Sequence, residues 1–209
     1  MNKRSLLVFA LSFLVLLIDQ VTKILVKTTM YINQEFQLFG SWFNIHFVEN
    51  EGMAMGISWG GELGKYSLTL FRIVAIIVLI VYIHSLIKKK ASMALLATMA
   101  LILAGAMGNV FDSLFYGLVF SDSYGQVASL VPWGTGYRSF MQGHVVDMIS
   151  IQLFRIPSWF PLYGGQKFFP FIFNVADAAI SVGIVLLVIF QKNFFIEEPS
   201  SSEEQVAEN

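Results

Sequence analysis

Four aspartates stand out because each lies in apolar surroundings, where a carboxylate is expensive. Asp19, Asp112 and Asp177 lie within or at the end of long apolar stretches, and Asp147 lies in the apolar run 145–149. An ionisable side chain inside a membrane-spanning segment costs about 2.5–3.5 kcal/mol on insertion scales and predicts a functional site. Two carboxylates brought close together cannot both ionise, so one activates a water while the other, still protonated, supplies a proton to the departing group. The residues therefore indicate acid–base hydrolysis, which needs no metal, cysteine or serine.

Two of these acids share a local pattern, Asn-x-x-Asp. It occurs at Asn109 with Asp112 and at Asn174 with Asp177. Residues three apart lie on one face of a helix, so each amide is expected to donate towards its neighbouring carboxylate. The spacing does not choose which two acids form the reacting pair. Geometry alone favours Asp112 with Asp177.

The first acid, Asp19, is followed four residues later by Lys23, and this spacing predicts an ion pair that cancels charge where burial is costly. A purely structural ion pair is the alternative interpretation of these two residues. A polar anchor at a helix end is the alternative for Asp112. Asp177 lies deeper in its apolar stretch and has no cation nearby in the sequence, so a structural role explains it less well.

The composition favours lipid as the main solvent of this chain. Of its 209 residues, 56% are hydrophobic and only 13% are charged, and the mean hydropathy is +0.68. A soluble domain carries about 25% charged residues to cover its surface. The net charge of −1 gives no basic footprint for nucleic acid. The absence of cysteine excludes disulfides, thiolate catalysis and cysteine-ligated zinc or iron–sulfur clusters.

Four apolar segments are long enough to cross a bilayer, which requires about 20 residues. They are 5–26, 66–87, 91–111 and 168–190. A buried helix of a soluble protein is the alternative for any one of them, but four such segments with so few charges elsewhere argue against it. We therefore expect an α-helical integral membrane protein with four transmembrane helices.

Positive charge is concentrated at the chain start, in one short turn and after the last span, which sets the orientation. These residues are Lys3, Arg4, Lys88, Lys89, Lys90 and Lys192. Both termini and the turn between the second and third spans are therefore expected in the cytoplasm. This topology brings Asp19, Asp112 and Asp177 to the outer ends of three separate spans, at one depth.

The two outer connections, 27–65 and 113–167, are expected to carry structure of their own. In the first, Phe43, Ile45 and Phe47 alternate with polar residues. This alternation is the period of a half-buried strand, so a small β-rich region is predicted on the periplasmic side.

The end of the second connection is expected to be an interfacial segment. Residues 151–171 are rich in Trp, Phe and Pro with scattered basic residues, a composition that suits the headgroup boundary. Residues 1–192 are then expected to form one membrane domain. The remaining residues, 193–209, are acidic and predict a disordered cytoplasmic tail.

Five short stretches of this sequence are similar to the motifs of one family. They are 19–23 (DQVTK), 50–54 (NEGMA), 105–112 (GAMGNVFD), 145–149 (VVDMI) and 173–177 (FNVAD). Each is weak alone, but together they occur in the order of the family and on the expected topology. The chain thus resembles lipoprotein signal peptidase (signal peptidase II), an aspartyl peptidase of the bacterial inner membrane.

The resemblance implies an endopeptidase that removes the signal peptide of a prolipoprotein by cleaving before a cysteine that already carries diacylglycerol. It implies that Asp147 and Asp177 are the catalytic pair, so that Asp147 takes the place that geometry alone gave to Asp112. Positions implied to support the pair or to bind substrate are Asp19, Lys23, Asn50, Gly52, Asn109, Asp112, Asn174 and Ala176.

The resemblance also implies the surroundings of the enzyme. No metal or other cofactor is expected. The expected partners are the lipidated prolipoprotein and membrane lipids, and the expected state is a monomer. The protein is expected in the bacterial inner membrane, with its active site near the periplasmic face.

Two features depart from the family pattern. The family usually has Arg directly after the acid at Asp112, whereas this chain has Ser113, so either Arg138 or Arg155 supplies that cation or none does. The stretch 113–143 is longer than the family's spacing and predicts an insertion on the outer face, whose role the sequence does not reveal.

Other patterns point to other functions and are less well supported. Gly-x-Ser-x-Gly at 56–60 matches a nucleophile elbow, but that motif requires an α/β sheet. His46, His84 and His144 are too scattered to share a metal. A proton-relay transporter has acids lining a path across the bilayer rather than clustered at one face. A lipid-binding protein, gripping acyl chains without chemistry, is the remaining alternative.

Overall fold

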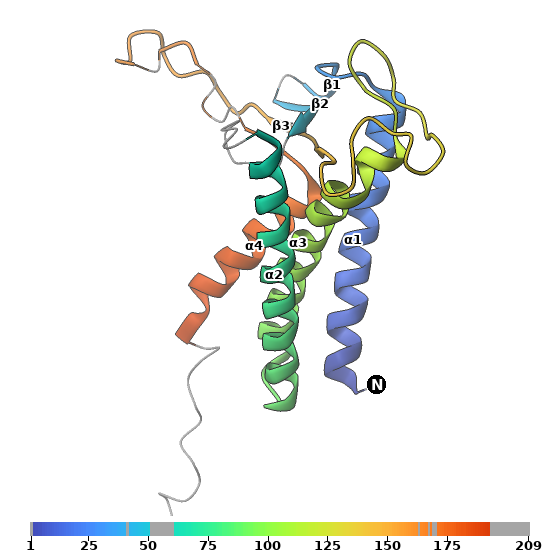
Figure 1. Ribbon diagram of the computed structural model, residues 1–209. Helices are drawn as coiled ribbons and strands as arrows, with labels where there is room; N and C mark the ends of the chain where they lie inside the picture. The colour runs from blue at the N-terminus through green and yellow to red at the C-terminus, as the bar shows by residue number, and fades with distance from the viewer. Residues whose placement is uncertain are drawn as a thin grey trace, which may run out of the picture.

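The described residues contain four helices and a small sheet. The computed structural model describes residues 2–40, 42–50, 61–162, 164–166, 168 and 171–192. The helices are α1 (Lys3–Thr29), α2 (Gly61–Lys88), α3 (Met93–Val119) and α4 (Val175–Ile189). The strands are β1 (Glu35–Phe39), β2 (Phe43–Asn50), β3 (Val145–Ile151) and β4 (Ile172–Phe173). Figure 1 shows the sheet at one end of the helices, which we call the sheet end; the N-terminus lies at the opposite end.

Three of the helices are long and apolar enough to cross a membrane. They are α1, α2 and α3, with 27, 28 and 27 residues. Large apolar side chains on their outward faces are exposed, among them Phe9, Val21 and Phe71. Exposed apolar side chains on this scale are expected of helices that are surrounded by lipid.

The fourth helix is shorter than the span expected at 168–190, and that expected start is wrong. α4 has 15 residues and is about 22 Å long at 1.5 Å per residue. The residues just before it belong to the sheet: Ile172 and Phe173 form β4 and pair with β3. Asn174 then caps the helix, its Oδ1 accepting a hydrogen bond from the backbone N–H of Asp177 (2.8 Å).

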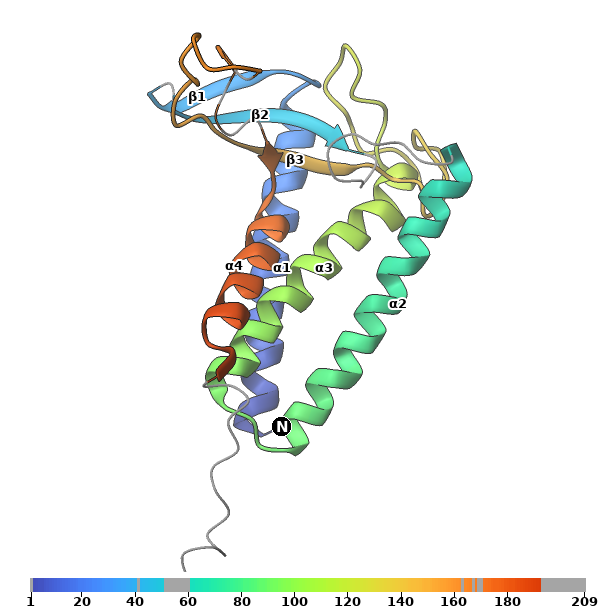
Figure 2. The same ribbon diagram turned by 90° about the vertical axis from the view of Figure 1, so that its left-hand side faces the viewer.

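α3 is the central helix of the bundle. α1 and α4 both pack along it, and α2 packs against it from another side, as Figure 2 shows. Glycines allow the close approach: a Cβ on Gly105 would lie 2.3 Å from the backbone oxygen of Ala176, and a Cβ on Gly108 would lie 2.5 Å from Asp19 Oδ2. Small residues at such contacts are typical of helices packed in membranes.

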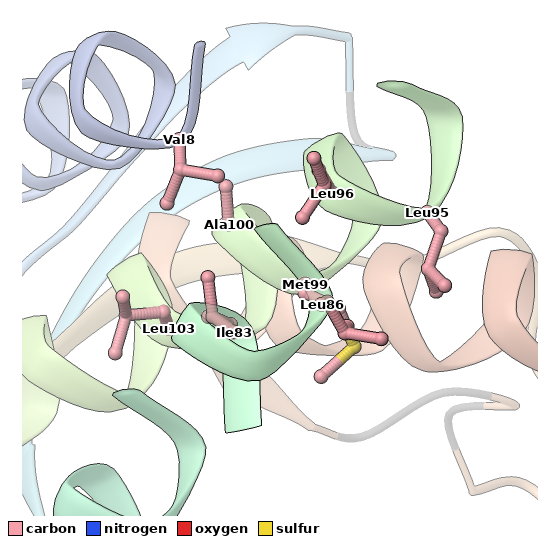
Figure 3. Packing of buried hydrophobic residues seen from close by; sticks show 8 residues of the cluster. All are labelled: Val8, Ile83, Leu86, Leu95, Leu96, Met99, Ala100 and Leu103. Carbon is pink, nitrogen blue, oxygen red and sulfur yellow. The ribbon is translucent and has the colours of Figure 1, made fainter. Parts of the chain in front are cut away.

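An apolar core fills the end of the bundle opposite the sheet. It is drawn in Figure 3 and combines residues of α1, α2 and α3: Val8, Ile83, Leu86, Leu95, Leu96, Met99, Ala100 and Leu103. This packing holds the three helices together at the end opposite the sheet, whereas buried charges lie at the sheet end.

The sheet lies across the sheet end of the helices, with strand order β1-β2-β3-β4 and antiparallel pairing throughout (Figure 2). β2 confirms the strand predicted from the alternation of Phe43, Ile45 and Phe47 with polar residues. Phe47 of β2 and Val146 and Met148 of β3 are buried in a second core with Tyr116 of α3. This core fixes the sheet on the helix ends.

The connection after α3 folds back on the end of that helix. α3 itself continues past the expected end at 111, to Val119, so the first part of the predicted insertion 113–143 is helical. The connection 120–144 then returns, and the backbone N–H of Arg138 donates to the oxygen of Gly117 (2.9 Å). The later part of the predicted insertion therefore returns to the end of α3.

Gly105→Ala is expected to lower stability, although alanine favours a helix by about 1 kcal/mol over glycine. The added Cβ would collide with the backbone oxygen of Ala176 and force α3 and α4 apart, at a cost of roughly 1–3 kcal/mol. The measurement is the Tm of the purified protein in detergent. An unchanged or higher Tm would contradict the tight contact between the two helices.

Candidate active site

Lys23 lies at the centre of a buried polar network at the sheet end of the bundle. Its side chain is fully buried, and its Nζ lies 2.9 Å from Asp19 Oδ2, 2.8 Å from Asp112 Oδ2 and 3.0 Å from Asn109 Oδ1. An ammonium has three N–H donors, and these contacts provide three acceptors. The ion pair predicted between Asp19 and Lys23 is therefore present, and Asp112 of α3 is its third member.

The two carboxylates that pair with Lys23 also hold backbone groups of other elements. Asp19 Oδ1 accepts a hydrogen bond from the N–H of Ala176 (2.9 Å), in the first turn of α4. Asp112 Oδ2 lies 3.3 Å from the N–H of Val146 in β3, which donates to it. The network thus ties α1 to α4 and α3 to β3, the two elements that carry the remaining acids.

Gln20 and Tyr116 complete this network, and sequence analysis did not single them out. Gln20 Nε2 donates to Asp112 Oδ1 (2.9 Å) and Asp19 Oδ2 (3.1 Å), and the Tyr116 hydroxyl donates to Gln20 Oε1 (3.1 Å). The one signal in the sequence is position: Tyr116 follows Asp112 by one helical turn. Asp112 is thus an ion-paired member of this network, which gives no support to the pairing with Asp177 that geometry alone favoured.

The two asparagines connect different elements, so the expected donation within each Asn-x-x-Asp pattern is also wrong. Asn109 Nδ2 donates to Asp177 Oδ1 on α4 (2.8 Å). Asn174 Nδ2 donates to Asp147 Oδ1 on β3 (2.6 Å) and lies 3.1 Å from Asn109 Oδ1. For Asn174 the physical reason is that it precedes the helix as its cap, so its side chain is not on a helical face with Asp177. Asn109 lies within α3, and its side chain instead reaches across to α4.

Asn174 joins Asp147 and Asp177. Its side chain holds Asp147, while its backbone N–H lies 3.3 Å from Asp177 Oδ2 and donates to it. Asn50, at the end of β2, donates to the second oxygen of Asp147 at 3.1 Å. Asp147 is only 4% exposed, whereas Asp177 is partly exposed. One acid from the sheet and one from the last helix therefore meet on a shared asparagine.

Burial raises the pKa of Asp147 to about 7, and the negative charge of Asp177 acts in the same direction. The hydrogen bonds from Asn50 and Asn174 act against this rise but do not outweigh burial. Asp147 therefore holds a proton up to about neutral pH. This is the arrangement that acid–base hydrolysis requires.

Ser113, which stands where the family usually has Arg, is held in α3 by its own hydrogen bond. It is fully buried, and its hydroxyl donates to the backbone oxygen of Asn109 (3.0 Å). Arg138 Nη1 lies 3.9 Å from Glu62, and Arg155 donates to a backbone oxygen in its own connection. Both arginines are thus engaged elsewhere.

Arg72 of α2 is the arginine that interacts electrostatically with the acids of the site, namely Asp177, Asp147 and Asp112. It is half-buried on the helix face that also carries the buried Thr69. Sequence analysis did not assign it to the site, although it is a lone charge in an apolar span, and that was the available signal.

Gly52, which the resemblance implies as a supporting position, lies outside the described residues. Within the described ranges, no group of three or more His, Cys, Asp or Glu side chains could hold a metal ion. The other implied positions all lie in or beside the network described above.

Comparison with known proteins decides the family. A family model described as signal peptidase (SPase) II matches residues 11–192 of this chain. The chain belongs to the signal peptidase II family. A lipoprotein signal peptidase of Porphyromonas gingivalis is 47% identical over 187 residues, which cover 87% of this chain and 81% of that protein. A lipoprotein signal peptidase of Amoebophilus asiaticus is 36% identical over 206 residues, covering 95% of this chain and 83% of that protein.

Solved structures agree with this assignment to signal peptidase II. Two solved structures, each described as a bacterial membrane enzyme, superpose with TM-scores of 0.57 and 0.56 at 25% identity, covering 87% and 91% of this chain and 90% and 93% of theirs. The protein is thus an aspartic signal peptidase II of a bacterial membrane, and it processes lipoprotein signal peptides. The resemblance noted in the sequence is confirmed.

Peptidase activity is expected to fall as the pH rises above about 7. If Asp147 donates a proton in the reaction, the cause is its raised pKa: burial raises it to about 7, so below this pH the acid form predominates and above it the proton is lost. The measurement is kcat/KM for a lipidated precursor between pH 5 and pH 9. A rate that stays level up to pH 9 would contradict a proton donor with this pKa.

Lys23→Met is expected to destabilise the protein by about 3–5 kcal/mol, because it leaves two buried carboxylates without their cation. The measurement is the Tm and the yield of folded protein in detergent. Lys88→Met serves as control, since Lys88 is an exposed lysine at the end of α2 that lies away from the sheet. Equal stability of the two variants would show that Lys23 is not the centre of the network.

Proposed function

We propose that Asp147 and Asp177 are the catalytic pair of this signal peptidase II, acting on the peptide bond before the lipidated cysteine of a prolipoprotein. The observation that carries the proposal is their shared partner: Asn174 donates to Asp147 through its side chain and to Asp177 through its backbone. The two acids also interact electrostatically, as a pair that shares one proton must.

The environments of the two acids suggest how they divide the work. Asp147 is almost fully buried, and its pKa of about 7 leaves a substantial fraction of it protonated at neutral pH, so it is the proposed proton donor. Asp177 is partly exposed, and its negative charge is stabilised by N–H donors from Asn109 and Asn174. It is the proposed base that takes a proton from the attacking water.

The hydrolysis then runs in two balanced steps. In the first, the water oxygen bonds to the scissile carbonyl carbon, Asp177 takes one water proton, and Asp147 gives its proton to the carbonyl oxygen. In the second, Asp177 passes its proton to the leaving nitrogen as the C–N bond breaks, and Asp147 recovers a proton from a hydroxyl of the adduct. Both acids return to their starting states.

The supporting roles follow from the contacts. Asn109 and Asn174 orient the two acids, and Asn50 holds the second oxygen of Asp147. Asp19, Lys23, Asp112 and Ala176 form the buried network that fixes the start of α4 and the edge of β3. Gly52 is proposed to support the substrate, on the resemblance alone.

We further propose that residues 1–192 form one domain whose α4 also crosses the membrane, with both termini in the cytoplasm and the sheet on the periplasmic side. α4 is apolar and packs along α3. The part of the segment 151–171 that lies within the described residues exposes large aromatic and apolar side chains, Trp159 and Leu162 among them, which suits the headgroup boundary. Residues 193–209, for which the sequence predicts a disordered cytoplasmic tail, lie outside the described residues.

A monomer suffices for this site, because all of its proposed groups come from one chain. The proposed route for the lipidated precursor is sideways from the bilayer, between α2 and α4, since these helices pack on different sides of α3 (Figure 2). Its acyl chains would stay in hydrocarbon, which sets the depth of the scissile bond. Arg72 of α2 would then lie on the substrate side of the acids.

Asp147→Asn and Asp177→Asn are each expected to reduce cleavage of a synthetic lipidated precursor by at least 1,000-fold, roughly the loss expected on removing a catalytic group. Each change keeps the shape of the side chain but removes its acid–base capacity. The measurement uses the purified protein with EDTA present, and activity of the parent protein is expected to persist. Asp122→Asn is the control, because Asp122 is an exposed carboxylate in the connection after α3.

Two outcomes would oppose the proposal. Retained cleavage in Asp147→Asn or in Asp177→Asn would exclude that acid from the pair. Full loss of activity with EDTA would require a metal that the described acids do not bind as a cluster. Dependence on lipidation, tested with an unlipidated precursor, separates this peptidase from a transporter or a lipid-binding protein.

A further inference from the structure

A second cluster of buried charge lies at the sheet end, and the proposed mechanism does not use it. It consists of Lys27 of α1, Glu49 of β2, and Ser123, Tyr137 and His144 of the connection after α3; we call it the Glu49 cluster. The Lys27 side chain is fully buried and that of Glu49 is 4% exposed. Figure 1 shows the connection rising beside the end of α1.

The Glu49 carboxylate is the centre of this cluster. Glu49 Oε1 forms an ion pair with Lys27 and accepts a hydrogen bond from Ser123 Oγ (2.8 Å). Glu49 Oε2 lies 3.1 Å from His144 Nδ1. The Lys27 ammonium lies 4.7 Å from the centre of the Tyr137 ring, and the Tyr137 hydroxyl accepts from the backbone N–H of His144 (2.7 Å).

Glu49 stays ionised over the whole working range of pH. Burial alone would raise its pKa, but the hydrogen bond with His144 and the charge of Lys27 lower it to about 2. A buried ion pair of this kind contributes little net stability, because desolvation offsets most of the attraction. Its value lies instead in fixing one arrangement of the groups around it.

Glu49 directly precedes a residue of the proposed active site in the sequence. Asn50, its neighbour in β2, donates to Asp147 Oδ2 (3.1 Å). Successive side chains of a strand point to opposite faces, so Glu49 is held on one face while Asn50 acts on the other. On β3, Glu49 is paired with Val146, directly before Asp147, and His144 directly precedes the strand.

We propose that Glu49 is a positioning residue for the reaction: anchored to α1 and to the connection 120–144, it holds the end of β2 so that Asn50 orients the Asp147 carboxylate. This gives the long connection after α3 a role, as a brace for the catalytic strand. The inference rests on the proposed function, because it needs Asp147 to be catalytic.

Glu49→Gln tests this in the purified full-length protein with a lipidated precursor. The amide keeps the size of the side chain but loses the charge that holds Lys27. We expect kcat to fall about tenfold, as small misplacements of a reacting group do, with KM within about twofold of the parent. Glu35→Gln is the matched control, a carboxylate exposed on β1 of the same sheet, and it should leave both constants unchanged.

The pH profile separates positioning from simple support. Because the Asn50 hydrogen bond lowers the pKa of Asp147, misplacing Asn50 should move the alkaline fall of kcat/KM to higher pH. Glu49→Gln and Asn50→Ala should therefore shift this limb in the same direction. A Glu49→Gln variant that loses only Tm, or whose kcat and alkaline limb match those of the parent, overturns the inference.

Ser123→Ala covers the case in which Glu49→Gln does not fold. It removes one donor to Glu49 from the connection and leaves the ion pair in place, so kcat should fall roughly threefold with the same shift of the alkaline limb. Parent-like kinetics would overturn the brace. If Asp147→Asn keeps its activity, the proposed function fails; if Asp147→Asn is inactive while Glu49→Gln and Ser123→Ala behave as the parent, only this inference fails.

Discussion

A buried ammonium that needs three acceptors is the constraint on which the site depends. Lys23 lies fully out of water, so each of its N–H groups must find an oxygen within the protein. Asp19, Asp112 and Asn109 provide them, from two helices. The two acids then accept backbone N–H groups from α4 and β3, so one cation fixes the relative positions of four elements.

Asn174 links this network to the two proposed catalytic acids. It is at once the cap of α4, the residue that follows β4, and the shared partner of the two proposed catalytic acids. The helix begins at this point because the preceding residues pair with β3, and that pairing brings the sheet acid beside the helix acid. α4 is therefore short because the residues directly before Asn174 form β4 and pair with the strand that carries Asp147.

The two ends of the bundle are held by different forces. Opposite the sheet, apolar side chains of three helices pack together; at the sheet end, buried charges and close glycine contacts bring the helices together. Within a lipid bilayer the hydrophobic effect contributes little to association between helices, so close packing and polar contacts contribute more to it. The Glu49 cluster extends this polar bonding to the strands and to the connection after α3.

The sequence by itself determined the solvent, the family, the strand at 43–48 and the ion pair of Asp19 with Lys23, because composition and short-range spacing carry that information. It also marked Asp147 and Asp177, but only through the similarity of motifs. Tertiary structure decided that the asparagines reach across to other elements, that Asp112 is occupied by Lys23 and Gln20, and where α4 begins. These depend on contacts between residues far apart in the chain, such as Asn109 with Asp177, and helical periodicity describes only neighbours along one helix.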